Sequence, residues 1–205
     1  MKTDLEIAKP PATHDLDRLQ AAAKKCRACP LWKTGTQTVF GEGPKKARIL
    51  FVGEQPGDRE DLEGKPFIGP AGRMLDKALA EAGIDRAETY VTNAVKHFKW
   101  EPAGKRRLHK KPNSREIAAC RPWLLAEVES LQPELIVCLG ATAAQSVLGR
   151  VVKIGEERGR LQPSAFGRTK VLVTVHPSSL LRIPDAASKG AAWKSFVADL
   201  GKLKR

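Results

Sequence analysis

The sequence predicts a three-layer α/β/α domain with a mostly parallel sheet of four strands. Short apolar runs with the length of buried strands lie at residues 47–54, 89–95, 134–140 and 170–176. These runs do not alternate between apolar and polar residues, as expected where helices cover both faces of a parallel sheet. Stretches with helical spacing separate the runs, and this order predicts parallel strands joined by crossover helices.

Two of the predicted helices follow from apolar spacing alone. Residues 71–84 place Leu75 and Leu79 on one face and reach Gly83, a residue type that commonly ends helices. The last helix, near residues 188–203, has an apolar face formed by Trp193, Phe196, Val197 and Leu200.

The helix that precedes the third strand is predicted from its capping residues. Asn113 or Ser114 can begin it, and Glu116 can complete a capping box. The helical pattern continues towards Leu131, with a break expected at Pro122 because proline lacks a backbone N–H.

Length and charge limit the classes of protein to which the chain can belong. With 205 residues we expect a single domain over residues 14–205, preceded by a flexible arm at residues 1–13. The formal net charge of +13 predicts a phosphate-bearing partner, and nucleic acid is the leading class. No apolar run is long enough to span a membrane, so a cytoplasmic protein is expected, nucleoid-associated through its nucleic-acid partner. A monomer is expected because no apolar helix face is left over once the sheet is covered.

The most basic stretch lies at residues 96–115, which hold eight Lys or Arg and a single acidic residue, Glu101. It has no strand or helix pattern of its own. A solvated loop is one interpretation, and a phosphate-binding loop with Phe98 and Trp100 as stacking surfaces is the other. Surrounding cations favour the uncharged form of His109, which would then be either a phosphate donor or a nucleophile.

Polar side chains follow three of the predicted strands, at the edge where ligands bind in such folds. A glycine-framed turn after the first strand displays Glu54, Gln55 and Asp58. Asn93 ends the second strand, and its amide offers a donor and an acceptor side by side, which suits a base edge. His176 ends the fourth strand, where a structural role is the alternative.

The four cysteines are Cys26, Cys29, Cys120 and Cys138. Disulfides are not expected in a reducing compartment. The spacing favours an iron-sulfur cluster over zinc, because a zinc ribbon would show a second C-x-x-C pair. Zinc and unligated thiols remain alternatives, and Cys138 lies in the apolar run "LIVCLG", as a core residue would.

Several motifs together resemble the iron-sulfur, family 4 branch of the uracil-DNA glycosylase superfamily. The resemblance covers about residues 20–200 and rests on "GEQPGDRED", "PFIGPAGRML", "VTNAVKHFK", "HPSSLLR" and the four cysteines. The loop "KRRLH" at residues 105–109 resembles the signature of the UdgX group, with Leu108 in place of its usual isoleucine.

This resemblance implies a uracil-DNA glycosylase-like fold and excision of uracil from DNA, with single-stranded DNA preferred and uracil as the product. The uracil is flipped into a pocket, where Phe67 would stack on the ring. Asn93 would read the uracil edge with Gln55 nearby, and His176 would stabilise the negative charge on the leaving base.

The resemblance also implies that His109 attacks C1′ of the sugar in place of water and leaves protein and DNA covalently joined after one turnover. Glu54 would orient the imidazole and accept its remaining proton, while Gln55 and Asp58 would complete the pocket wall. A 4Fe-4S cluster would be held by all four cysteines. The residues expected to contact DNA are Lys105, Arg106, Arg107, Lys110, Ser178, Ser179, Leu181 and Arg182.

Two alternatives stay open at this point. In a conventional multiple-turnover glycosylase, water would attack and His109 would only position phosphate. A non-catalytic iron-sulfur DNA-binding protein would account for the charge, but it would not require Glu54, Asn93 and His176 together at strand ends.

Overall fold

The computed structural model describes residues 5–204 and contains a central five-stranded sheet. Across the sheet the strands lie in the order β2 (Thr89–Asn93), β1 (Ile49–Gly53), β5 (Leu135–Leu139), β7 (Lys170–Thr174) and β6 (Leu161–Pro163). The first four are parallel, which confirms the predicted strands, and β6 pairs antiparallel with β7 at one edge. The sequence did not predict β6, because a strand of three residues is too short to form an apolar run and two of its residues are exposed.

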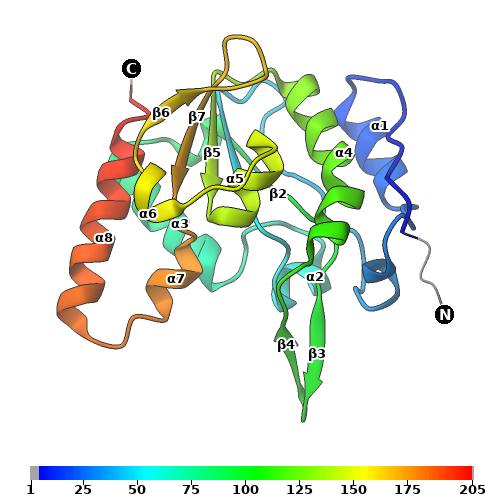
Figure 1. Cartoon of the computed structure of the whole chain (residues 1–205), viewed down its shortest axis with the longest axis horizontal. Coiled ribbons are helices and arrows are strands. Elements are labelled where there is room, and N and C mark those ends of the chain that lie inside the picture. Colours follow the sequence, from blue (N-terminus) through cyan, green and yellow to red (C-terminus); the bar gives the residue numbers. More distant parts are fainter. Residues whose placement is uncertain (1–4, 205) are drawn as a thin grey trace.

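Helices cover both faces of the sheet, as predicted (Figure 1). One face packs against α1 (Leu16–Ala23), α4 (Ser114–Leu131) and α5 (Ala141–Leu148). The other packs against α3 (Pro70–Ala82) and α8 (Ala186–Gly201). The shorter elements are η1 (Pro30–Lys33), α2 (Asp58–Glu63), η2 (Arg86–Glu88), α6 (Ile154–Glu157) and α7 (Pro177–Leu181).

Helix α4 begins as predicted and continues further than predicted. Asn113 and Glu116 form a reciprocal capping box at its start. The break expected at Pro122 does not occur, and the helix runs on to Leu131. Proline removes only one helical hydrogen bond, and buried side chains on both sides of it, such as Cys120 and Leu124, pack into the same core.

The basic stretch forms a β-hairpin, which corrects the expectation of an irregular loop. Strands β3 (Trp100–Ala103) and β4 (Arg106–His109) pair antiparallel, and Gly104 adopts φ +60° in the turn. Figure 1 shows the hairpin projecting from the body of the domain. Both of its faces are largely exposed, so it carries no apolar alternation. The register sets His109 opposite Trp100, at the base of the hairpin.

Part of the predicted N-terminal arm lies against the domain. The backbone N–H of Glu6 donates to the carbonyl of Ala28, and that of Ala8 donates to the carbonyl of Ala119. Residues 1–4 of the predicted arm lie outside the described residues. Within residues 5–204, no helix has the length and apolar character needed to cross a membrane.

Candidate active site

The carboxyl edge of the sheet brings the predicted site residues together. Glu54 and Gln55 directly follow β1, Asn93 ends β2, and His176 follows β7. The base of the hairpin adds His109, whose Nε2 lies 2.9 Å from Gln55 Nε2 and 3.8 Å from Glu54 Oε1. Parallel strands of this fold end at one edge, and that edge is where ligands bind.

The protonation of His109 is set by Gln55. The Oε1 atom of Gln55 accepts the N–H of Lys99, and its amide group donates to the carbonyl of Lys110 and faces His109 Nε2. An amide NH₂ can only donate, so Nε2 accepts and holds an unshared electron pair. Burial lowers the pKa of the half-exposed His109, with Glu54 opposing this and Arg182 adding to it. His109 is therefore uncharged at neutral pH.

Glu54 is held by a residue that the sequence did not single out. The hydroxyl of Thr142, in the first turn of α5, donates to Glu54 Oε2 at 2.5 Å. This leaves Oε1 as the atom nearest the imidazole of His109. A polar residue in "LGATAA", directly after the third predicted strand, was the available signal.

His176 takes the opposite tautomer. The backbone N–H of Ser178 donates to His176 Nδ1 at 3.2 Å, so Nδ1 has no proton and the neutral ring carries it on Nε2. Burial lowers the pKa of His176 to about 4, and nearby His109 and Arg182 act in the same direction. His176 can therefore donate Nε2–H to a developing oxyanion as an uncharged group.

Asn93 and Phe67 lie beside Gly53, and a side chain at residue 53 would fill the space between them. A Cβ there would meet Asn93 Oδ1 at 2.4 Å and Phe67 Cζ at 2.7 Å. Phe67 adopts φ 59°, and its carbonyl lies where a Cβ of Gly72 would be. The ring centroid of Phe67 lies 6.4 Å from that of His176. Two glycines thus allow an aromatic ring and an amide to lie close to the end of β1.

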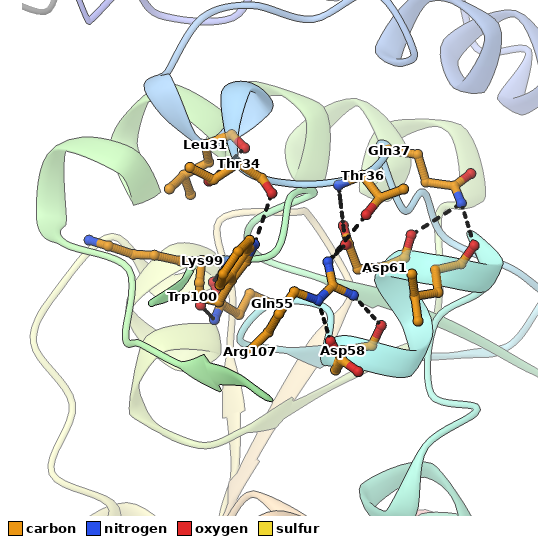
Figure 2. A network of polar contacts seen from close by, with 11 residues as sticks. Leu31, Thr34, Thr36, Gln37, Gln55, Asp58, Asp61, Lys99, Trp100 and Arg107 are labelled. Atoms are coloured by element: carbon orange, nitrogen blue, oxygen red, sulfur yellow. Dashed lines mark hydrogen bonds and ion pairs between the residues drawn. The ribbon is translucent and has the colours of Figure 1, made fainter. Parts of the chain in front are cut away.

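Arg107, which was predicted as a DNA contact, anchors the hairpin. Figure 2 shows its guanidinium between Asp58 and Asp61 of α2. It donates to Asp58, to the fully buried Asp61 at 2.6 Å and to the hydroxyl of Thr36. Asp58, predicted at the pocket wall, is accordingly a partner of Arg107.

A second hydrogen bond ties the hairpin to the segment after η1. The indole N–H of Trp100 donates to the carbonyl of Thr34 at 2.8 Å (Figure 2). Because Trp100 pairs with His109 across the hairpin, this bond also fixes the strand opposite the imidazole. The position of His109 therefore depends on both α2 and the N-terminal segment.

The other residues predicted to contact DNA differ in whether their side chains are exposed or already bonded to other residues of the protein. Lys105 and Arg106 are exposed near the hairpin turn, and Lys110 pairs with Glu101. Phe98 is 1% exposed and cannot stack on a base. In α7 and its C-cap residue, Leu181 and Arg182 are exposed. Ser178 and Ser179 instead form hydrogen bonds with His176.

The structure brings three of the four cysteines together. Cys26, Cys29 and Cys120 line one small cavity. Burial raises the pKa of Cys120 to about 12, and the other two thiols add to this rise. Cys138 is not among the residues that line the cavity. It lies in the fully buried part of β5, where burial alone raises its pKa.

His97 lines the same cavity and was not predicted. Thr38 donates its hydroxyl proton to the carbonyl of Ala23, so its oxygen accepts from His97 Nε2–H at 3.0 Å, and Nδ1 keeps a lone pair. Burial lowers the pKa of His97 to about 4, which keeps it neutral. Thiolates and neutral imidazoles suit iron-sulfur clusters and zinc. Within residues 5–204, no three such side chains already stand in metal-binding geometry.

Comparisons with known proteins agree with one another. A family model described as the uracil DNA glycosylase superfamily matches residues 40–201. The chain is 45% identical over 160 residues to a type-4 uracil-DNA glycosylase of Thermotoga maritima, covering 78% of this chain and 79% of that protein. It is 35% identical over 193 residues to a type-4 uracil-DNA glycosylase of Pyrobaculum aerophilum, covering 91% and 94%.

Proposed function

The chain belongs to the uracil DNA glycosylase superfamily and is a uracil-DNA glycosylase, and we propose that it ends its reaction by joining His109 to the DNA. The observation that carries the proposal is the unprotonated Nε2 of His109 beside Glu54, at the edge of the sheet that also presents Asn93 and His176. A conventional enzyme needs only a water molecule at this position.

Three residues act on the flipped uracil in this proposal. Phe67 stacks on the ring, and the Asn93 amide pairs with its N3 and O4 edge. Cytosine is rejected because its exocyclic amine would place a donor against a donor. His176 donates Nε2–H to the uracil oxygen on which negative charge develops.

The bond between C1′ and N1 breaks with its electron pair leaving on uracil. The lone pair of His109 Nε2 then forms a bond to the cationic C1′, and the ring loses its Nδ1 proton to solvent. Glu54 is nearest the attacking nitrogen, so it stabilises the positive charge on sugar and ring instead of taking the remaining proton. No second nucleophile is required, and the protein stops after one turnover.

The competing function is a conventional glycosylase. The relatives described above are named type-4 uracil-DNA glycosylases, and Glu54 is partly exposed, so it could orient a water molecule. Water would then attack C1′, and an abasic site would be released.

The two functions are separated by one experiment. The protein is mixed with a uracil-containing single-stranded oligonucleotide, fully denatured and analysed by gel electrophoresis, beside a His109→Ser variant and a uracil-free oligonucleotide. A protein-DNA adduct that survives heat and detergent, and that is absent from both controls, supports attachment through His109. Alkali-labile abasic sites without an adduct would show a conventional enzyme.

We also propose that an iron-sulfur cluster is held by Cys26, Cys29 and Cys120, with His97 as the fourth donor in place of Cys138. The support is that these four side chains line one cavity, with His97 uncharged. When bound, the cluster would be structural, because the reaction involves no change of oxidation state. It would tie the N-terminal segment to α4.

A further inference from the structure

A buried lysine lies directly behind the residue proposed to read uracil. Lys96 is 1% exposed, and its ammonium group donates to Thr92 Oγ1 at 2.6 Å, to the carbonyl of Asn93 at 2.8 Å and to Glu127. Its three protons are therefore all used, as a buried ammonium group requires.

Glu127 completes this network from α4. Its side chain is fully buried and accepts from the backbone N–H of Gly41 and from the hydroxyls of Tyr90 and Thr92, in addition to Lys96. An ion pair with all its hydrogen bonds satisfied can be kept in a core, but an apolar pair of similar size is often as stable. Stability alone therefore does not explain why charges occupy this place.

The Asn93 side chain differs from Lys96 and Glu127 in its hydrogen bonding. It is 3% exposed, and its amide has no hydrogen-bond partner within residues 5–204, but the unbonded amide atoms stay open to solvent, because no sealed side-chain N or O atom in that range lacks a partner. An amide that reads a base must leave its donor and acceptor free until the base arrives. Its orientation must then come from the backbone that carries it.

The peptide group between Asn93 and Ala94 is hydrogen-bonded at both its carbonyl and its N–H. The N–H of Ala94 donates to the carbonyl of Gly53 at 2.9 Å, and the Asn93 carbonyl accepts from Lys96 Nζ. The first bond extends the β1–β2 pairing. The second is the only hydrogen bond that a side chain makes to the Asn93 backbone within residues 5–204.

We propose that the Lys96–Glu127 pair is a positioning device that aims the Asn93 amide at uracil. Lys96 holds the Asn93 carbonyl, and Glu127 holds Lys96 from the rigid helix α4. The inference rests on the proposed reading role of Asn93. Neither Lys96 nor Glu127 touches the substrate.

The test replaces the pair as a unit. The double variant Lys96→Met, Glu127→Leu removes both charges together, so no unpaired charge stays in the core. Uracil release is measured under single-turnover conditions with excess protein, in the wild-type chain and in an Asn93→Ala chain. We expect the pair replacement to slow release about tenfold in the wild-type chain and less than about twofold in the Asn93→Ala chain, because the effect acts through Asn93.

Equal slowing in both chains would overturn the positioning role and leave the reading role intact. An Asn93→Ala variant as fast as the wild type would overturn the reading role, and the positioning role with it. Thermal unfolding and iron content are measured for each variant, because Lys96 N–H also contacts Cys120 Sγ. If the double variant does not fold, Glu127→Gln, which keeps the shape and weakens the hold on Lys96, must show the same dependence on Asn93.

Arg158→Met is the matched control. Arg158 pairs with the buried Asp199, which also accepts from Thr174 and lies on α8, in the layer across the sheet from α4. This variant should lower the melting temperature without changing the single-turnover rate. A slowed rate in Arg158→Met would show that general destabilisation suffices, and it would overturn the proposal.

Discussion

The amide NH₂ of Gln55 donates its two protons to Nε2 of His109 across 2.9 Å and to the carbonyl of Lys110 across 3.0 Å, while its Oε1 accepts the backbone N–H of Lys99. One side chain thereby connects the end of β1 to both strands at the base of the hairpin. Gln55 both selects the tautomer of His109 and positions its imidazole ring, so a substitution at Gln55 alters the tautomer and the ring position together.

Replacing Gln55 with leucine should slow adduct formation about fivefold while uracil release persists, because a neutral hydrogen bond contributes about 1 kcal/mol. Adduct and free uracil are quantified from the same reaction. Gln37→Leu is the control, since Gln37 also donates to two carbonyls, those of Asp61 and Leu62, without contacting His109. An unchanged adduct rate in Gln55→Leu would contradict the role of Gln55.

The reaction should be lost only as the pH falls below about 6.5. Both imidazoles act uncharged, and burial lowers the pKa of His109 and takes that of His176 to about 4. A lowered pKa means that protonation, and with it loss of the lone pair on His109, sets in only as the pH falls below the ordinary value of about 6.5. Adduct formation measured from about pH 8 to pH 4 checks this, with circular dichroism to confirm folding. A midpoint at or above pH 6.5 would contradict the environment assigned to His109.

Arg107 and Arg106 should have separate roles although they are neighbours on β4. Arg107→Met leaves the buried carboxylate of Asp61 without its cationic partner, which should lower the free energy of unfolding by about 3 kcal/mol and abolish the adduct. Arg106→Met should leave stability unchanged and weaken DNA binding in a salt-dependent way, because its side chain is exposed. Chemical denaturation and DNA-binding titrations at two salt concentrations distinguish them. Similar effects of both substitutions would rule out the anchoring role.

The cysteines can be tested without an activity assay. Cys120→Ala and His97→Ala should each reduce bound iron and acid-labile sulfide, since both side chains line the shared cavity. Cys138→Ala should keep the full iron content and only lower stability slightly, by removing a sulfur atom from the packed core. Loss of iron in Cys138→Ala would restore the original four-cysteine assignment.

The sequence predicted the strands and the residues at their ends because buried parallel strands leave an apolar run that needs no neighbour to be recognised. It could not predict the hairpin, since β3 and β4 are held by contacts to α2 and Thr34 instead of by an apolar face. The anchoring role of Arg107 was missed for the same reason. A cation in a basic stretch is indistinguishable from its neighbours until its partner, here Asp61, is located in space.

The relative placement of the cysteines could not be read from the sequence for a related reason. Cys138 and Cys120 are equally plausible ligands by type, and only the fold shows that the first lies in β5 and the second faces Cys26 and Cys29. Thr142 and His97 act on groups far away in the chain, so the position of Thr142 directly after a predicted strand was its only local signal, and no local spacing pointed to His97.

Gly53 offers the most direct test of where uracil binds. Alanine at this position would bring a methyl group within 2.4 Å of Asn93 Oδ1 and 2.7 Å of Phe67 Cζ, so the amide and the ring must both move. We expect uracil release to fall about a hundredfold, because displacements of this size are costly at a reacting centre. Binding to a uracil-free oligonucleotide should not change, since no base is flipped into the pocket. Gly155→Ala is the control, because nothing lies within 4 Å of its Cβ position. Normal uracil release by Gly53→Ala would mean that the base does not bind against Asn93 and Phe67, and the assignment of both residues to uracil recognition would fail together.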